Sequence, residues 1–135
     1  IPLFEFMDDA ELYQVARLVA EQWLDDGTFL ARQGDRGREL YLVLEGAIEV
    51  IKEGGTAWKV VYVAGVGDVV GELVVLADRP RSASLRARGN TKVLTMRGSD
   101  FRDLLREHPD LSEQVIGMLT ERLAERDPTE ALPSD

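Results

Sequence analysis

Hydrophobic residues change their spacing twice along the chain, and the first stretch has the spacing of a helix. Between residues 8 and 23 the apolar side chains recur every three or four positions, as on one helix face: Leu12, Val15, Ala16, Val19 and Trp23. Asp8 is a suitable N-cap, and Glu11 three residues later completes a capping-box-like start. The pattern predicts a helix over residues 8–23, ended by the turn signal Asp26-Gly27.

The middle of the chain, residues 28–97, has the pattern of short strands. Leu40–Leu44 is an apolar run of strand formers, and residues 82–88 alternate strictly between polar and apolar side chains. Gly54-Gly55 predicts a hairpin that leads into a strand at Trp58–Val63. Further turn residues recur between the apolar runs, at Gly34, Gly37, Gly46, Gly65, Gly67 and Gly89-Asn90. This spacing predicts about eight antiparallel strands in a sandwich or barrel.

The last third returns to helical spacing. Ser99 is placed to cap a short helix whose inner face carries three apolar residues: Phe101, Leu104 and Leu105. His108-Pro109 ends that helix, and Pro109 suits the first turn of a second helix over residues 109–126. The length of 135 residues fits one domain, residues 1–127, and residues 128–135 are expected to form a flexible acidic tail.

Composition excludes several kinds of site. The chain has no cysteine, so a thiolate metal site and a disulfide are excluded. Its one histidine, His108, stands beside Pro109 at a helix junction, which argues against a histidine-based catalytic triad. Metal-binding residues are therefore expected to be absent. The net charge of −9 argues against direct binding to nucleic acid, and no apolar run is long enough to insert into a membrane. A cytoplasmic location is compatible with the lack of cysteine and is the expectation here.

The charge is unevenly distributed, and this directs attention to the middle of the chain. Residues 27–98 carry eleven basic and eight acidic residues, net +3, whereas both ends are strongly acidic. A small anion would therefore bind in the middle. Gly65, Gly67 and Gly71 do not complete a dinucleotide-binding fingerprint, because Val70 stands where the third glycine is required. They are interpreted as turn glycines.

The most informative stretch is residues 71–84. Gly71 opens a short apolar turn whose free N–H groups suit an anion, and Glu72 adds a carboxylate. Pro80 rigidifies the return, and Arg81 then offers a planar fork that suits a phosphate. Ser82 and Ala83 are small enough for the backbone to approach the same ligand. Taken alone, these residues favour a surface loop closed by an Arg81–Glu72 ion pair somewhat over an anion-binding site.

This stretch resembles the phosphate-binding cassette of cyclic nucleotide-binding domains, which occur in kinase regulatory subunits, in cyclic nucleotide-gated channels and in bacterial catabolite-activator-type regulators. The matching segments are Val70-Gly71-Glu72-Leu73-Val74-Val75-Leu76 and Pro80-Arg81-Ser82-Ala83-Ser84, with Gly34-Asp35, Leu40-Tyr41 and Gly46 upstream. The resemblance covers nearly the whole chain. It implies an α+β fold, in which an antiparallel eight-stranded jelly-roll barrel carries an N-terminal helix and a C-terminal helical pair.

The resemblance also implies roles for individual residues. Arg81 would pair with the cyclic phosphate, and Glu72 would accept the ribose 2′-hydroxyl with help from Gly71. Ser82 and Ala83 would donate to the phosphate. The remaining contacts implied are Leu73 in the cassette, a pocket lining of Val61, Val63 and Val69, and a lid over the base from Leu119, Arg122 or Leu123. Val70 replaces the usual aromatic residue, and Ser82 leaves the choice between cyclic AMP and cyclic GMP open, with cyclic AMP favoured.

The expected function is therefore a sensor rather than an enzyme, with no cofactor beyond the cyclic nucleotide. Binding would be relayed through the C-terminal helix to an effector outside this chain, and a homo-oligomer is left open. Two alternatives were weighed. A degenerate module of the same fold could serve a structural or oligomerisation role without ligand, but both Glu72 and Arg81 are present. A cupin-like enzyme on a similar barrel would need several histidines.

Overall fold

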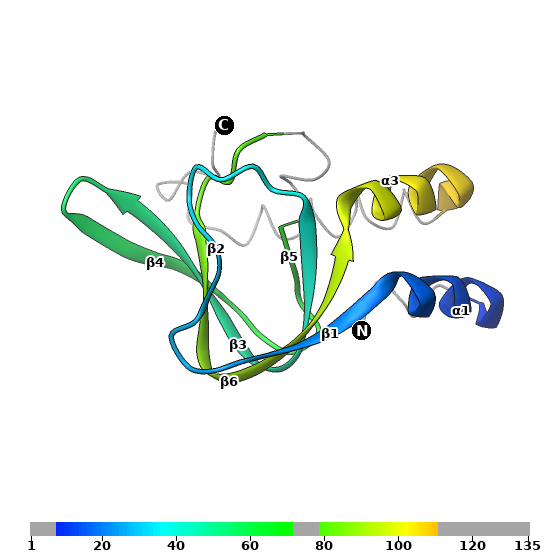
Figure 1. Cartoon of the computed structure of the whole chain (residues 1–135), viewed down its shortest axis with the longest axis horizontal. Coiled ribbons are helices and arrows are strands. Elements are labelled where there is room, and N and C mark those ends of the chain that lie inside the picture. Colours follow the sequence, from blue (N-terminus) through cyan, green and yellow to red (C-terminus); the bar gives the residue numbers. More distant parts are fainter. Residues whose placement is uncertain (1–7, 72–78, 111–135) are drawn as a thin grey trace.

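The computed structural model describes residues 8–71 and 79–110, and all structural statements concern these residues. They form an antiparallel sheet with a helix before it and a helix after it (Figure 1). In chain order the elements are α1 (Asp9–Leu18), β1 (Val19–Leu24), β2 (Phe29–Ala31), β3 (Glu39–Gly54), β4 (Ala57–Ala64), β5 (Val69–Val70), β6 (Ser84–Arg97) and α3 (Gly98–Glu107).

The first helix begins where the sequence predicts and ends earlier. Asp8 and Glu11 form a capping box in which each side chain accepts from the other residue's backbone N–H. The helix stops at Leu18, and residues 19–24 pair with β6 instead, from Val19 opposite Met96 to Leu24 opposite Thr91. The prediction of a helix through Trp23 was wrong because this strand pairing takes precedence over helical spacing. Trp23 is 60% exposed rather than packed on a helix face.

The strand count also differs from the prediction. The described residues form six strands in the order β1-β6-β3-β4, with β2 on β6 and β5 on β3, and within them no pairing closes the sheet into a barrel. Two of the predicted turns lie inside long strands. Gly46 lies within β3, which bends there, and Gly89-Asn90 lies within β6. Gly46 has a φ of +80°, and a Cβ there would lie 2.6 Å from the Asn90 carbonyl. Each long strand therefore replaces two predicted strands.

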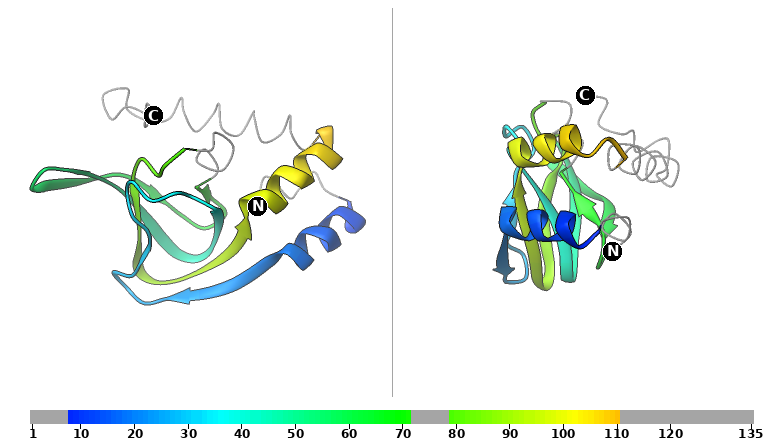
Figure 2. Two further views of the ribbon diagram at one scale, coloured as in Figure 1. Left: turned by 45° about the horizontal axis from the view of Figure 1, so that its top comes forward. Right: turned by 90° about the vertical axis from the view of Figure 1, so that its right-hand side faces the viewer.

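Two hydrophobic clusters lie on opposite faces of the sheet. The helix cluster packs α1 and α3 against the strands and consists of Val15, Leu40, Leu42, Val69, Met96, Phe101 and Leu104. The sheet cluster takes the alternating positions and includes Tyr41, Val43, Ile48, Val50, Val70, Ala83, Leu85 and Val93. Figure 2 shows the two helices side by side at one end and the β3–β4 hairpin extending from the other.

The C-terminal region agrees with the prediction in part. Phe101 and Leu104 are buried on the inner face of α3, and the helix ends at His108 as predicted. Ser99 does not cap it, since Arg97 occupies the N-cap position, and its side chain makes no capping hydrogen bond. His108, at the end of α3, contacts α1: its Nδ1 lies 2.9 Å from Oε2 of Glu11. The second predicted helix beyond residue 110, and the tail 128–135, lie outside the described residues.

Candidate functional site

The backbone of Arg81 is fixed by the loop between β2 and β3. The Arg81 N–H donates to the Asp35 carbonyl at 2.7 Å, and the Gly34 N–H donates to the Arg81 carbonyl at 2.6 Å. Arg36 and Pro80 form an isolated bridge beside these bonds. Two segments that lie more than forty residues apart in sequence are thus held together, and the position of the arginine is set by backbone geometry.

The Arg81 side chain lies inside the protein rather than on a surface loop. Arg81 is 5% exposed, and its Nη2 donates to the Glu39 carbonyl at 2.7 Å. Its guanidinium carbon lies 5.6 Å from the centre of the Tyr41 ring, within range of a cation–π interaction. A guanidinium has five N–H donors in a planar fork, so it can bind an anion bidentately while one donor stays on Glu39.

Gly71 makes room for this arginine. It has a φ of +89°, and a Cβ at this position would lie 2.8 Å from Nη1 of Arg81 and 3.0 Å from the Glu39 carbonyl. A side chain here would have to displace the guanidinium. The backbone of the cassette therefore approaches Arg81 as closely as it does because residue 71 is glycine.

Two backbone N–H groups lie next to Arg81 in a bend of the chain. The chain leaves the sheet before β6 begins at Ser84, so Ser82 and Ala83 form a bend. Among the described residues no hydrogen bond is found for the backbone N–H of either one. Ala83 is 8% exposed and Ser82 is half-buried. Buried N–H groups need a partner, so this bend and the Arg81 fork form a site with anion-binding chemistry.

Tyr41 gives the site a neutral wall. Burial raises the pKa of the Tyr41 hydroxyl above its ordinary value of 10.0, the nearby Arg81 charge acts in the opposite direction, and Glu39 adds to the rise. The phenol therefore stays protonated at neutral pH and does not neutralise the guanidinium beside it. The positive charge of Arg81 remains available to an anion.

The three valines expected to line the pocket do not all belong to the same hydrophobic cluster. Val61 is half-buried and packs against the sheet cluster, and Val63 is half-buried on β4. Val69 is 2% exposed but belongs to the helix cluster, so it faces away from Tyr41 and Arg81. Its neighbour Val70 lies in the sheet cluster, paired with Tyr41. The alternation of side chains along a strand would have identified Val70 instead.

Several expected residues lie outside the described part of the chain. They are Glu72 and Leu73 in the cassette, and Leu119, Arg122 and Leu123 in the expected lid. Their roles therefore stay predictions. Two residues that contact the Arg81 side chain, Glu39 and Tyr41, were not predicted. Tyr41 belongs to a motif quoted above, but no local signal linked it to Arg81.

The described residues contain neither a cluster of metal-binding side chains nor a membrane-spanning helix. No group of three or more histidine, cysteine or acidic side chains that could hold a metal ion occurs in residues 8–71 or 79–110. Over the same residues, none of the helices has the length and apolar character needed to cross a membrane.

Comparison with known proteins agrees with this geometry. The family model described as "Cyclic nucleotide-binding domain" matches residues 21–108. The chain is 36% identical to lysophospholipase nte1 of Aspergillus fumigatus over 82% of its length, but it covers 8% of that protein. It is 31% identical to the cAMP-dependent protein kinase regulatory subunit of Yarrowia lipolytica over 96% of its length, and it covers 31% of that protein.

A solved structure gives the same result for the fold. The catabolite activator protein of Thermus thermophilus superposes with a TM-score of 0.82 at 28% sequence identity, over 93% of this chain and 59% of that one. The shared region is therefore a domain of longer proteins whose other parts differ. On the family match over residues 21–108, the chain belongs to the cyclic nucleotide-binding domain family.

Proposed function

We propose that this domain reversibly binds a 3′,5′-cyclic nucleotide, with cyclic AMP favoured over cyclic GMP, and acts as a sensor rather than as an enzyme. The observation that carries the proposal is the buried Arg81 fork beside the backbone N–H groups of Ser82 and Ala83, for which residues 8–71 and 79–110 supply no hydrogen-bond partner. A cyclic phosphate has one negative charge and two exocyclic oxygens, so it matches one guanidinium and a pair of N–H donors.

The remaining contacts follow the family pattern. Glu72 would accept the ribose 2′-hydroxyl together with the Gly71 backbone, and Leu73 would lie in the cassette turn above the phosphate. The apolar lining would come from Val61, Val63 and Val70. Arg81 is held by backbone bonds to Gly34 and Asp35, and a residue fixed by the fold in this way loses less conformational freedom on binding.

The preference for cyclic AMP is supported by one relative. The Yarrowia lipolytica protein is named as a cAMP-dependent kinase regulatory subunit, and this chain aligns with it over nearly its full length. The match to lysophospholipases covers too little of those enzymes to transfer their activity. A ligand-free structural module is the alternative, and the presence of both Glu72 and Arg81 argues against it.

The signal would leave the domain through the helix that begins at Pro109. Leu119, Arg122 or Leu123 would cover the base, so that ligand binding shifts this helix toward a docked state that an effector in the cytoplasm detects. Hydrogen exchange would test this relay. Protection of residues 109–126 should rise when ligand is added, and equal protection with and without nucleotide would contradict it.

A thermal shift assay with cyclic AMP, cyclic GMP and 5′-AMP tests the binding itself. A ligand that binds only the folded state must raise the melting temperature, and above Kd the stabilisation grows with the logarithm of the ligand concentration. We expect a rise with cyclic AMP, a smaller rise with cyclic GMP and none with 5′-AMP, whose phosphate is not cyclic. The absence of any shift with either cyclic nucleotide would favour the ligand-free module.

A further inference from the structure

Gln33 makes an unusual pair of hydrogen bonds with β3, near the turn of the β3–β4 hairpin. Its side-chain Nε2 donates to the Glu53 carbonyl at 2.9 Å, and the Glu53 N–H donates to its Oε1 at 2.8 Å. The amide of one side chain thereby satisfies both backbone groups of Glu53, as a neighbouring strand would.

The position of this contact in the sheet explains its effect. The pairing of β3 with β6 ends at Ile51 opposite Ser84, and continuing the same register would place Glu53 opposite Ser82. The chain bends away at Ser82 and Ala83, so the Gln33 amide occupies the hydrogen-bonding position that β6 leaves. Glu53 stays paired, and Ser82 is not drawn into the sheet.

The same segment also holds the arginine. The Gln33 N–H donates to the buried Ser84 hydroxyl at 2.9 Å, and that hydroxyl donates to Oε2 of Glu53. The next two residues, Gly34 and Asp35, make the backbone bonds to Arg81. Three consecutive residues therefore connect the hairpin on one side with the phosphate-binding arginine on the other.

We infer that Gln33 is a positioning residue for the proposed site: it keeps Ser82 and Ala83 out of the sheet and couples Arg81 to the β3–β4 hairpin. This inference rests on the proposed function, because the ligand it positions is the cyclic phosphate. Binding at Arg81 should then stabilise the pairing at Glu53, and loosening Gln33 should weaken binding although Gln33 itself does not contact the phosphate.

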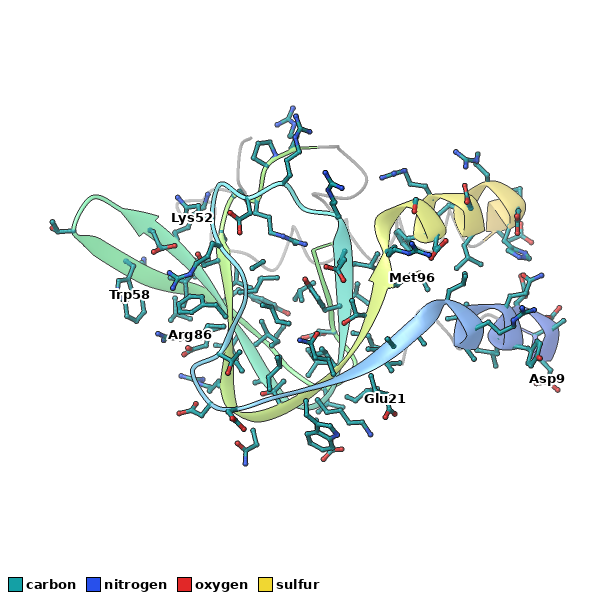
Figure 3. The ribbon with its side chains drawn as sticks, in the orientation of Figure 1. Asp9, Glu21, Lys52, Trp58, Arg86 and Met96 are labelled. Atoms are coloured by element: carbon teal, nitrogen blue, oxygen red, sulfur yellow. The ribbon has the colours of Figure 1, made fainter. Side chains whose placement is uncertain are left out.

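Trp58 is a fluorescent probe of the hairpin beside Glu53. It lies opposite Glu53 in the β3–β4 register, is 54% exposed, and stacks with Arg86, whose guanidinium carbon is 4.7 Å from its ring centre (Figure 3). The chain has two tryptophans, so Trp23→Phe leaves Trp58 as the single emitter. Its fluorescence then reports the state of the hairpin while calorimetry reports affinity for cyclic AMP.

The test compares Gln33→Met, which keeps the size but removes the amide, with Gln22→Ala on the exposed part of β1 as a control. We expect cyclic AMP to change Trp58 emission in the Trp23→Phe protein. Gln33→Met should abolish that change and weaken cyclic AMP binding by about three- to tenfold, the range for one or two hydrogen bonds. The control should retain both. A Gln33→Met protein that is merely less stable, with unchanged affinity and emission change, would overturn the inference.

A measurement on the unmodified chain keeps the inference testable if Gln33→Met does not fold. Exchange of the Glu53 backbone N–H should slow when cyclic AMP is added, because its partner Gln33 is anchored to the liganded arginine. Unchanged exchange at Glu53 in a protein that binds cyclic AMP would also overturn the inference. If the unmodified protein binds no cyclic nucleotide, the proposed function fails instead.

Discussion

Gly71 and Arg81 are mutually dependent: a Cβ on Gly71 would lie 2.8 Å from Nη1 of the arginine. Gly71→Ala therefore combines an unfavourable backbone conformation, at a φ of +89°, with displacement of the phosphate-binding group. We expect it to weaken cyclic AMP binding by at least about tenfold, as for loss of a buried charged contact, measured by calorimetry.

Gly67→Ala is the matched control for that substitution. Gly67 has a φ of +91° but nothing lies within 4 Å of its Cβ position, so the variant shares the backbone strain without the collision. Both variants should lose about 1–3 kcal/mol of unfolding free energy from strain. Equal affinity for cyclic AMP in the two variants would show that Gly71 does not protect Arg81.

Ser82→Ala tests the choice of base. Under the proposed function, the Ser82 hydroxyl would lie between the phosphate and a syn purine, where a guanine amino group would reach it and adenine offers no such group. We expect cyclic GMP to lose about 0.5–1.5 kcal/mol of binding free energy, the value of one hydrogen bond, and cyclic AMP less. Equal losses in competition titrations would mean that Ser82 contacts the phosphate alone.

Arg86→Ala tests a contact that stabilises the sheet away from the site. Nε and Nη2 of Arg86 both donate to Oε1 of Glu49, a carboxylate that is 8% exposed. Truncation leaves that buried charge with the longer contact to Arg88, at 3.4 Å, so unfolding free energy should fall by about 1–3 kcal/mol. Arg88→Ala, on an exposed side chain, should cost less than about 1 kcal/mol in urea titrations.

The buried phenol of Tyr41 should make the free energy of unfolding depend on pH in the alkaline range. Burial raises the pKa of its phenol above 10.0, so the folded protein holds this proton at pH values where the unfolded chain has lost it. The resulting contribution to the free energy of unfolding is fully present below about pH 10. It is lost as the pH rises through the folded-state pKa of Tyr41. Between about pH 9 and pH 11 the wild type should therefore lose more unfolding free energy than Tyr41→Phe. Tyr13→Phe, at an exposed phenol, serves as the control, and parallel curves for wild type and Tyr41→Phe would contradict the account.

Local features of the fold were predictable and distant pairings were not. The capping box of Asp8 and Glu11 depends on residues three positions apart, and it forms as predicted. The end of α1 depends on β6, whose Thr91 to Met96 lie some seventy residues later. Gly46 was read as a turn because its partner is also distant: it bends β3 against Asn90 and Thr91 within one continuous strand.

At the site, too, the features local in sequence were predictable and the contacts between distant segments were not. The sequence Pro80-Arg81-Ser82-Ala83 carries the chemistry of an anion site within four residues, and the structure brings Gly71 to it. The residues that hold the arginine come from elsewhere: Glu39 and Tyr41 on β3 and the loop after β2. Nothing local in those segments indicates phosphate chemistry, because their role is fixed by the sheet register and by backbone bonds.

The most direct test of the central claim is calorimetric titration of cyclic AMP into the wild type, Arg81→Lys and Arg79→Ala. Lysine keeps the charge but loses the planar fork and the bond to Glu39, whereas Arg79 is an exposed arginine two residues away. The account predicts that binding is at least about tenfold weaker in Arg81→Lys and unchanged in Arg79→Ala, with both variants folded. Binding that Arg81→Lys leaves intact, or that Arg79→Ala removes, would contradict the assignment of Arg81 as the phosphate-binding residue.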